Sequence, residues 1–293
     1  MKPVKWNLLN LHIWITCFDY TFGILTIPFM LMPKFVGYPL GVLKYLGIST
    51  LCQCFIVAVM FINMLLSILT VYENRFHILC TFSLKPYWTK WRKIVFLIYY
   101  VLCVSLLLPI SNFVPEQQEE SKLRILQTLP CPPSYLYEAP IFVLTEDFTY
   151  HLSAEVTVIA TTCFAVLFLV IYLIYNGIQQ LKTGAMSKKT FDMHKMFFIA
   201  IVIQMEVPLV MFVIPLIYAL ISLLGDYYNQ KWTNIAILFI STHGIVATAV
   251  MIMVHRPYRD VFLGLFKRRA RLSQNHSVRG LQYQNSSIAP IEK

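Results

Sequence analysis

Apolar residues gather into six long windows along the chain, and shorter polar segments separate these windows. Each window holds about 20 or more residues, which is the length that a helix needs to cross the hydrocarbon core of a bilayer. The windows cover residues 8–31, 47–71, 94–113, 156–175, 196–223 and 235–254. This pattern predicts six membrane-spanning helices.

Composition agrees with this interpretation. Hydrophobic residues make up 58% of the 293 residues, charged residues only 13%, and the mean hydropathy is +0.64. Soluble domains carry about 25% charged residues, so we expect much of this chain to lie out of contact with water. The formal net charge of +10 does not indicate a nucleic-acid partner, because the basic residues lie in short connections between apolar windows. We therefore expect an all-α, polytopic transmembrane helix bundle.

The basic residues also predict the orientation of the bundle. Of the 24 lysines and arginines, 19 fall on the side of Met1 and five on the other side. Cytoplasmic loops are rich in these residues, so both termini are expected in the cytoplasm. We expect residues 1–272 to form the bundle with its juxtamembrane segment, and residues 273–293 to form a disordered tail. Residues 260–272 read either as an amphipathic helix lying on membrane lipids or as a plain stop-transfer cluster.

The long connection at residues 114–155 falls on the outer side and is acidic. It contains Cys131, and Cys52 and Cys54 stand near the same outer face at the start of the second window. A disulfide from Cys131 to Cys52 or Cys54 suits an oxidising compartment. A free Cys131 is the alternative, and the sequence leaves both open.

Three ionisable residues fall near the middle of predicted spans: Asp19, Glu206 and His243. Charged groups at this depth are costly, so such residues usually pair with one another or mark functional sites. We expect one polar layer contributed by three helices. It reads either as a ligand contact or conformational switch, or as a satisfied hydrogen-bond network between helices.

At the inner end of the second window, Glu73 stands two residues before Arg75. The spacing suggests a local ionic latch that faces the cytoplasm. The alternative is a solvated Glu73 and an Arg75 that extends to the interface.

Catalytic and metal-binding motifs are missing from the sequence. No HExxH, GxSxG or P-loop pattern occurs, and no Cys/His spacing suits a metal ion. We expect neither an enzyme nor a cofactor.

Several segments together resemble the nematode seven-helix chemoreceptors of serpentine receptor class H, called Srh. Residues 1–12 resemble that family's MKxVKWxLLNLH segment. The other matching positions are Asp19, Pro28, Pro33, 72–76, 130–132, Lys189, Thr190, Ile203, Gln204, Pro208, His243, Gly244 and 255–259. In the family the MKxVKW segment is the first cytoplasmic loop, so the six spans resemble family helices two to seven of a rhodopsin-like GPCR architecture.

The resemblance implies a chemosensory G-protein-coupled receptor in the plasma membrane of sensory cilia. Its expected partners are an external small molecule and a heterotrimeric G protein, the latter at the inner face. The residues expected at that face are Glu73, Arg75, Lys188, Lys189, Arg256, Tyr258 and Arg259. Glu206 departs from the family pattern, which makes it a candidate for ligand chemistry. A truncated receptor remnant that does not signal and a small-molecule transporter are the alternative functions.

Overall fold

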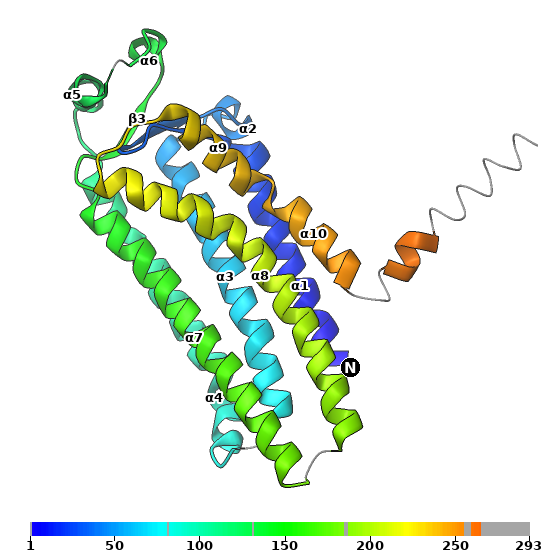
Figure 1. Ribbon diagram of the computed structural model, residues 1–293. Helices are drawn as coiled ribbons and strands as arrows, with labels where there is room; N and C mark the ends of the chain where they lie inside the picture. The colour runs from blue at the N-terminus through cyan, green and yellow to red at the C-terminus, as the bar shows by residue number, and fades with distance from the viewer. Residues whose placement is uncertain (1, 81, 131, 185–186, 255–258, 265–293) are drawn as a thin grey trace, which may run out of the picture.

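The computed structural model describes residues 2–80, 82–130, 132–184, 187–254 and 259–264. Long helices form a bundle that is closed at one end by a small sheet and short helices (Figure 1). The long helices are α1 (Lys2–Tyr20), α3 (Thr50–Leu79), α4 (Lys85–Ser105), α7 (Thr149–Lys182), α8 (Lys188–Leu224), α9 (Gln230–Ser241) and α10 (His243–Val254). The shorter helices are η1 (Thr21–Thr26), α2 (Val42–Tyr45), η2 (Leu108–Phe113), α5 (Gln118–Thr128) and α6 (Tyr135–Glu138).

Polar residues that cap the first turn mark where three of these helices begin. The side chains of Ser49, Ser187 and Asn229 accept hydrogen bonds from backbone amides of α3, α8 and α9, respectively. Such caps satisfy amide groups that have no partner inside the helix. Short polar connections therefore suffice to end one helix and begin the next.

Apolar side chains cover the outside of the bundle as well as its inside. Within the described residues, five helical stretches are long and apolar enough to cross a bilayer. They are Trp6–Thr26, Thr50–Leu79, Lys85–Phe113, Thr149–Lys182 and Gln230–Val254, and Leu209–Leu224 is a shorter apolar stretch within α8. Only 6% of the apolar window in Lys85–Phe113 is buried, and Phe164 on α7 is 74% exposed. Such surfaces suit lipid rather than water.

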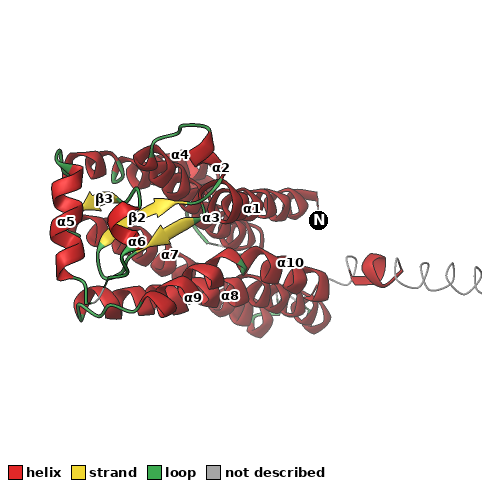
Figure 2. Cartoon of the chain, turned by 90° about the horizontal axis from the view of Figure 1, so that it is seen from above, coloured by secondary structure: helices red, strands yellow, loops and turns green. Residues whose placement is uncertain are grey.

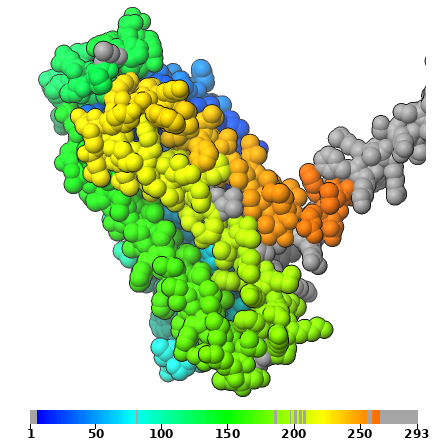
Figure 3. Space-filling model, viewed as in Figure 1, coloured from blue at the N-terminus to red at the C-terminus, as the bar shows by residue number. Residues whose placement is uncertain are grey.

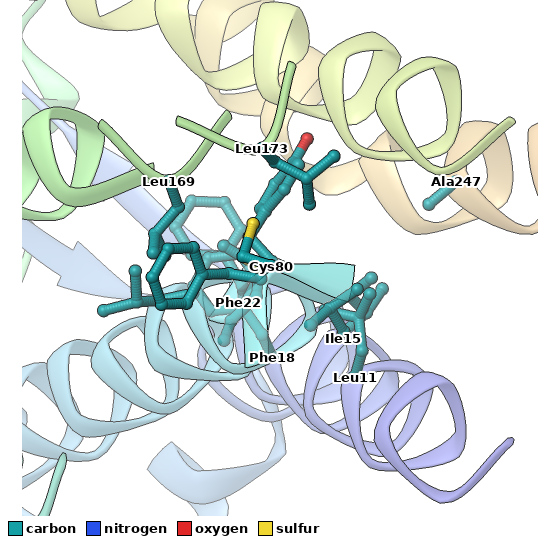
Figure 4. Packing of buried hydrophobic residues seen from close by; sticks show 13 residues of the cluster. Leu11, Ile15, Phe18, Phe22, Cys80, Leu169, Leu173 and Ala247 are labelled. Atoms are coloured by element: carbon teal, nitrogen blue, oxygen red, sulfur yellow. The ribbon is translucent and has the colours of Figure 1, made fainter. Parts of the chain in front are cut away.

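The main core joins α1, α3, α7 and α10. Leu11, Ile15 and Phe18 of α1 pack with Leu169 and Leu173 of α7 and with Ala247 of α10 (Figure 4). Residues spaced three or four apart share one face of a helix, which is why these positions of α1 line up. This packing buries one face of α1 against the bundle, while Trp6, Ile13 and Tyr20 on the helix stay exposed.

A three-stranded antiparallel sheet caps one end of the bundle, which we call the sheet end (Figure 2). The strands are β1 (Pro28–Met30), β2 (Phe35–Pro39) and β3 (Phe142–Thr145), in the order β1-β2-β3. Leu31, Val36, Leu126, Leu136 and Val143 belong to a separate hydrophobic core between the sheet and the short helices α5 and α6.

The sheet corrects the expectations for two segments. The window at residues 8–31 was predicted as helix throughout, but the chain leaves the helix after Thr26 and enters β1. The connection at 114–155 was predicted only as a long acidic segment on the outer side, and it contains α5, α6 and β3. The strand β1 pairs with the nearby β2, whereas β3 pairs with β2 across more than 100 residues of the chain.

The opposite end of the bundle, which we call the basic end, contains the α3–α4 and α7–α8 connections and the start of α1 (Figure 1). Segments that the charge count assigned to one side of the membrane thus meet at one end. Helix α8 runs from the basic end to the sheet end beside α7 and α9 (Figure 3). The window at 235–254 forms two helices, because the helix is interrupted at Thr242, directly before His243.

Candidate functional site

A cavity of about 420 Å³ lies inside the bundle below the sheet. Its walls come from α1, η1, α3, η2, α7, α8 and α9, and its roof includes Met30, Phe35 and Leu144 from the sheet. The lining is mostly apolar and aromatic, with a few polar groups, as is common for small-molecule pockets. Its position, covered by the segments between helices, suits a ligand that arrives at the sheet end.

Three phenylalanines, which we call the aromatic floor, lie at the mid-bundle side of this cavity: Phe18, Phe61 and Phe212. Their ring centroids are 5.6–5.8 Å apart. The rings of Phe18 and Phe212 also contact the imidazole of His243, at 5.8 and 4.5 Å. His243 is only 1% exposed. The floor therefore connects the cavity to a buried ionisable group at the start of α10.

His243 pairs with Asp19, as two of the three members of the predicted polar layer. The Nδ1 atom of His243 lies 2.6 Å from an Asp19 carboxylate oxygen. The angles are those of an ion-pair contact rather than an aligned hydrogen bond, since neither atom meets hydrogen-bond geometry. The carboxylate also lies against Gly244, where an added Cβ would be 1.4 Å from the second oxygen. Only glycine at 244 leaves room for this pair.

Glu206 does not join that pair, which corrects the predicted layer of three. Its side chain is exposed on α8, and its charge acts on Tyr72 of α3 rather than on His243. Six residues separate Glu206 from Phe212, which corresponds to about 9 Å of helix. The prediction counted depth from residue 196, but α8 begins at Lys188 and has 37 residues, so the apolar window gives a poor measure of depth.

At the basic end, Glu73 joins α3 to α4. Its carboxylate accepts hydrogen bonds from Trp88 Nε1 at 2.8 Å and from Arg92 Nη2 at 2.5 Å. Glu73 is 1% exposed and Arg75 is 8% exposed. The predicted latch is therefore corrected: Arg92 of the next helix holds Glu73, and neither Glu73 nor Arg75 is solvated.

The other residues predicted for the inner face divide into two groups. Lys188 and Lys189 are exposed in the first turn of α8, and Arg259 is exposed in a helical stretch at 259–264. Arg256 and Tyr258 lie outside the described residues, as does most of the predicted amphipathic segment. Glu73 and Arg75 lie inside the bundle and not on its surface.

The cysteines carry free thiols where the structure describes them. Cys52 is exposed and Cys54 is half-buried, and Cys131 lies outside the described residues. No described cysteine forms the predicted disulfide. In the described part of the chain, no group of His, Cys, Asp and Glu side chains could hold a metal ion.

Ion pairs stabilise the segments at the sheet end. Arg124 of α5 donates to Glu120 at 2.8 Å and to Glu146, after β3, at 2.7 Å. Hydrogen bonds from Arg124 and then Ser121 lower the pKa of the Glu146 carboxyl. Lys34 pairs with Asp226 at 2.8 Å, which ties the β1–β2 turn to the α8–α9 connection.

Sequence reasoning missed two cavity residues, His151 and Glu155. The fourth apolar window was predicted to begin at residue 156, so both residues were counted as part of the acidic connection at 114–155. They stand four residues apart in the first turns of α7 and therefore share one face of the helix. That spacing, together with the neighbouring apolar window, was a signal that could have identified them.

Comparisons with known proteins point to one family. A model of the family "Serpentine type 7TM GPCR chemoreceptor Srh" matches residues 1–268. The protein "Serpentine receptor class H-72" of Caenorhabditis elegans is similar, with 23% identity over 276 residues that cover 91% of this chain and 76% of that protein. No solved structure matches.

Proposed function

Because the chain belongs to the Srh family of serpentine seven-transmembrane chemoreceptors, and is thus an integral membrane protein of a GPCR family, we propose that it detects an external small molecule in the cavity below the sheet. In this proposal a heterotrimeric G protein binds at the basic end. The receptor lies in the plasma membrane of sensory cilia with the basic end inside.

The observation that carries the proposal is the double role of Phe18 and Phe212. Both rings line the cavity, and both contact His243. A ligand that displaces the aromatic floor therefore changes the surroundings of the Asp19–His243 pair. A ligand shifts a conformational equilibrium only through its different affinity for the two states, and the floor supplies such a difference.

The Asp19–His243 pair lies at the junction of α9 and α10, from which a change can spread to other helices. A single turn residue, Thr242, separates these two helices. Helix α10 runs from His243 in the direction of the basic end, and Met251 near its end contacts His12 in the middle of α1. A change at the pair can thus pass through α10 to α1, the helix that begins at the basic end.

At the basic end, we assign different roles to the buried and exposed candidates. Lys188, Lys189 and Arg259 are exposed and supply positive charge for contact with the G protein. Glu73 holds α3 against α4 through Trp88 and Arg92. Glu73 thereby acts on the geometry of this end and makes no direct contact with the partner.

The test is to fill the cavity. Ala236 lines it, whereas Ala160 is exposed on the outside of α7 and does not line it. Cells expressing the full chain with a G-protein dissociation sensor are screened with a panel of small molecules. We expect Ala236→Phe to remove the response to any activating compound and Ala160→Phe to keep it. A response that survives Ala236→Phe unchanged would place the ligand elsewhere.

A further inference from the structure

Glu155 is a carboxylate that faces the cavity. On α7 it belongs to the stripe formed by His151, Val158 and Thr162, and these three neighbours are buried at 4–7% exposure. Positions three, four and seven apart lie on one side of a helix, so Glu155 points to the interior of the bundle. It nevertheless keeps exposed surface, because the space in front of it is the cavity that it lines.

No hydrogen bond or ion pair joins Glu155 to another described residue, and no lysine or arginine is among the described residues that line the cavity. Tyr218 and Thr233, which also line the cavity, hydrogen-bond to each other and to the Asn229 carbonyl, but two other polar residues lack partners. Both ring nitrogens of His151 and the hydroxyl of Thr26 are buried with no hydrogen-bond partner in the described part of the chain. A carboxylate in an apolar enclosure is unfavourable unless it is paired, so the site lacks a counter-ion.

We propose that the ligand is an organic ammonium ion with an apolar body, and that Glu155 binds its charged group; this rests on the proposed function of the cavity. The rings of the aromatic floor offer their faces to a cation or pack against its apolar part. His151 and Thr26 supply hydrogen bonds that fix its orientation. An anionic ligand would be repelled, and a neutral one would leave the carboxylate unpaired.

The charge at the entrance agrees with this choice. Residues 27–49, 106–155 and 225–234 form the sheet end, and they contain eight acidic and five basic residues. The chain as a whole carries +10, so the excess of acid is confined to this end. A net negative charge at this end favours the approach of cations over anions.

Cys54 allows a test without a known ligand, because its free thiol lines the same cavity. Purified full-length receptor in nanodiscs is treated with a trimethylammonium-ethyl methanethiosulfonate, its sulfonate-ethyl analogue or the neutral methyl reagent. Each reagent converts the thiol to a mixed disulfide and releases methanesulfinate. Modification of Cys54 is measured by mass spectrometry of its peptide, with Cys54→Ser as the blank. Rates are divided by those of a free thiol in solution.

We expect the cationic reagent to react with Cys54 at least tenfold faster than the anionic one. Glu155→Gln should bring this ratio close to one, and Glu155→Asp, which keeps the charge, should restore most of it. Glu138→Gln is the matched control, since Glu138 is an exposed acid of the sheet end that does not line the cavity. The ratio compares two reagents on one thiol, so a change in thiolate fraction cancels.

The outcomes separate this inference from the proposed function. If the neutral reagent reaches Cys54 but the charged reagents show no preference, or Glu155→Gln leaves the preference intact, the cation class is overturned and the cavity remains the ligand site. If no reagent modifies Cys54, the cavity is closed to solutes and both proposals fail.

Discussion

Replacing Gly244 by alanine tests the Asp19–His243 pair without touching either partner. The added Cβ would lie 1.4 Å from one Asp19 carboxylate oxygen and 2.4 Å from Cγ. The backbone at Gly244 is helical, so alanine itself fits there without strain. The Asp19 carboxylate must therefore turn away, and the 2.6 Å contact with His243 is lost.

Two opposing effects set the size of the change. Losing a buried interaction with a charged group destabilises a protein by about 1.5–3 kcal/mol. Alanine in place of glycine within a helix stabilises by up to about 1 kcal/mol. We expect a net destabilisation of about 1–2 kcal/mol from Gly244→Ala. If Asp19 is first replaced by alanine, there is no carboxylate to displace, and the same substitution should be neutral or stabilising.

The assay is thermal unfolding in detergent, monitored by fluorescence-detected size-exclusion chromatography. The four proteins compared are the natural sequence, Gly244→Ala, Asp19→Ala and the double variant. At roughly 2–4 °C per kcal/mol, Gly244→Ala should lower Tm by about 2–8 °C in the natural sequence. In the Asp19→Ala background it should leave Tm unchanged or raise it. An equal loss in both backgrounds would mean that the cost does not come from the carboxylate, and the reasoning about the pair would be wrong.

Three further predictions concern the two ends of the molecule. Glu73→Gln removes the charge that binds Arg92, and breaking a buried ion pair by removing one partner costs about 3–5 kcal/mol; we expect a clear loss of surface expression and of Tm, which Glu138→Gln should not cause. Because Arg124 lowers the pKa of Glu146 in the folded protein, this interaction stabilises above the ordinary glutamate pKa of about 4.3 and weakens as pH falls through the lower folded value. Glu146→Gln should therefore flatten the dependence of Tm on pH in that acidic range, and an unchanged profile would contradict the assignment. An epitope tag at the C-terminus should be stained only in permeabilised cells, and staining of intact cells would reverse the proposed orientation.

The helices were predictable because their signal is local. A window of about 20 apolar residues implies a spanning helix regardless of what it packs against, since lipid leaves few alternatives. The segments assigned to opposite sides of the membrane accordingly lie at opposite ends of the bundle (Figure 1). Interruption at Thr242 was not predicted, because neither proline nor glycine stands before His243 in that window.

The sheet and the partners of the buried charges depend on long-range contacts that one sequence does not reveal. Val36 of β2 pairs with Val143 of β3, more than 100 residues later. Glu73 finds Arg92 on the next helix, although Arg75 is nearer in the chain. Of the predicted polar layer, Asp19 and His243 meet, but Glu206 lies elsewhere because helix length and tilt decide depth.

The pairing of β3 with β2 has a consequence for how such receptors diversify. Backbone amides and carbonyls join the strands, and the strand residues Val36 and Val143, which belong to the core with α5, do not line the cavity. Phe35 and Leu144 point into the cavity from this roof and can be exchanged by single mutations while the strands stay paired. Under the proposed function, copies of the gene can change which ligand they bind by single substitutions in the roof, while the backbone of the sheet stays the same.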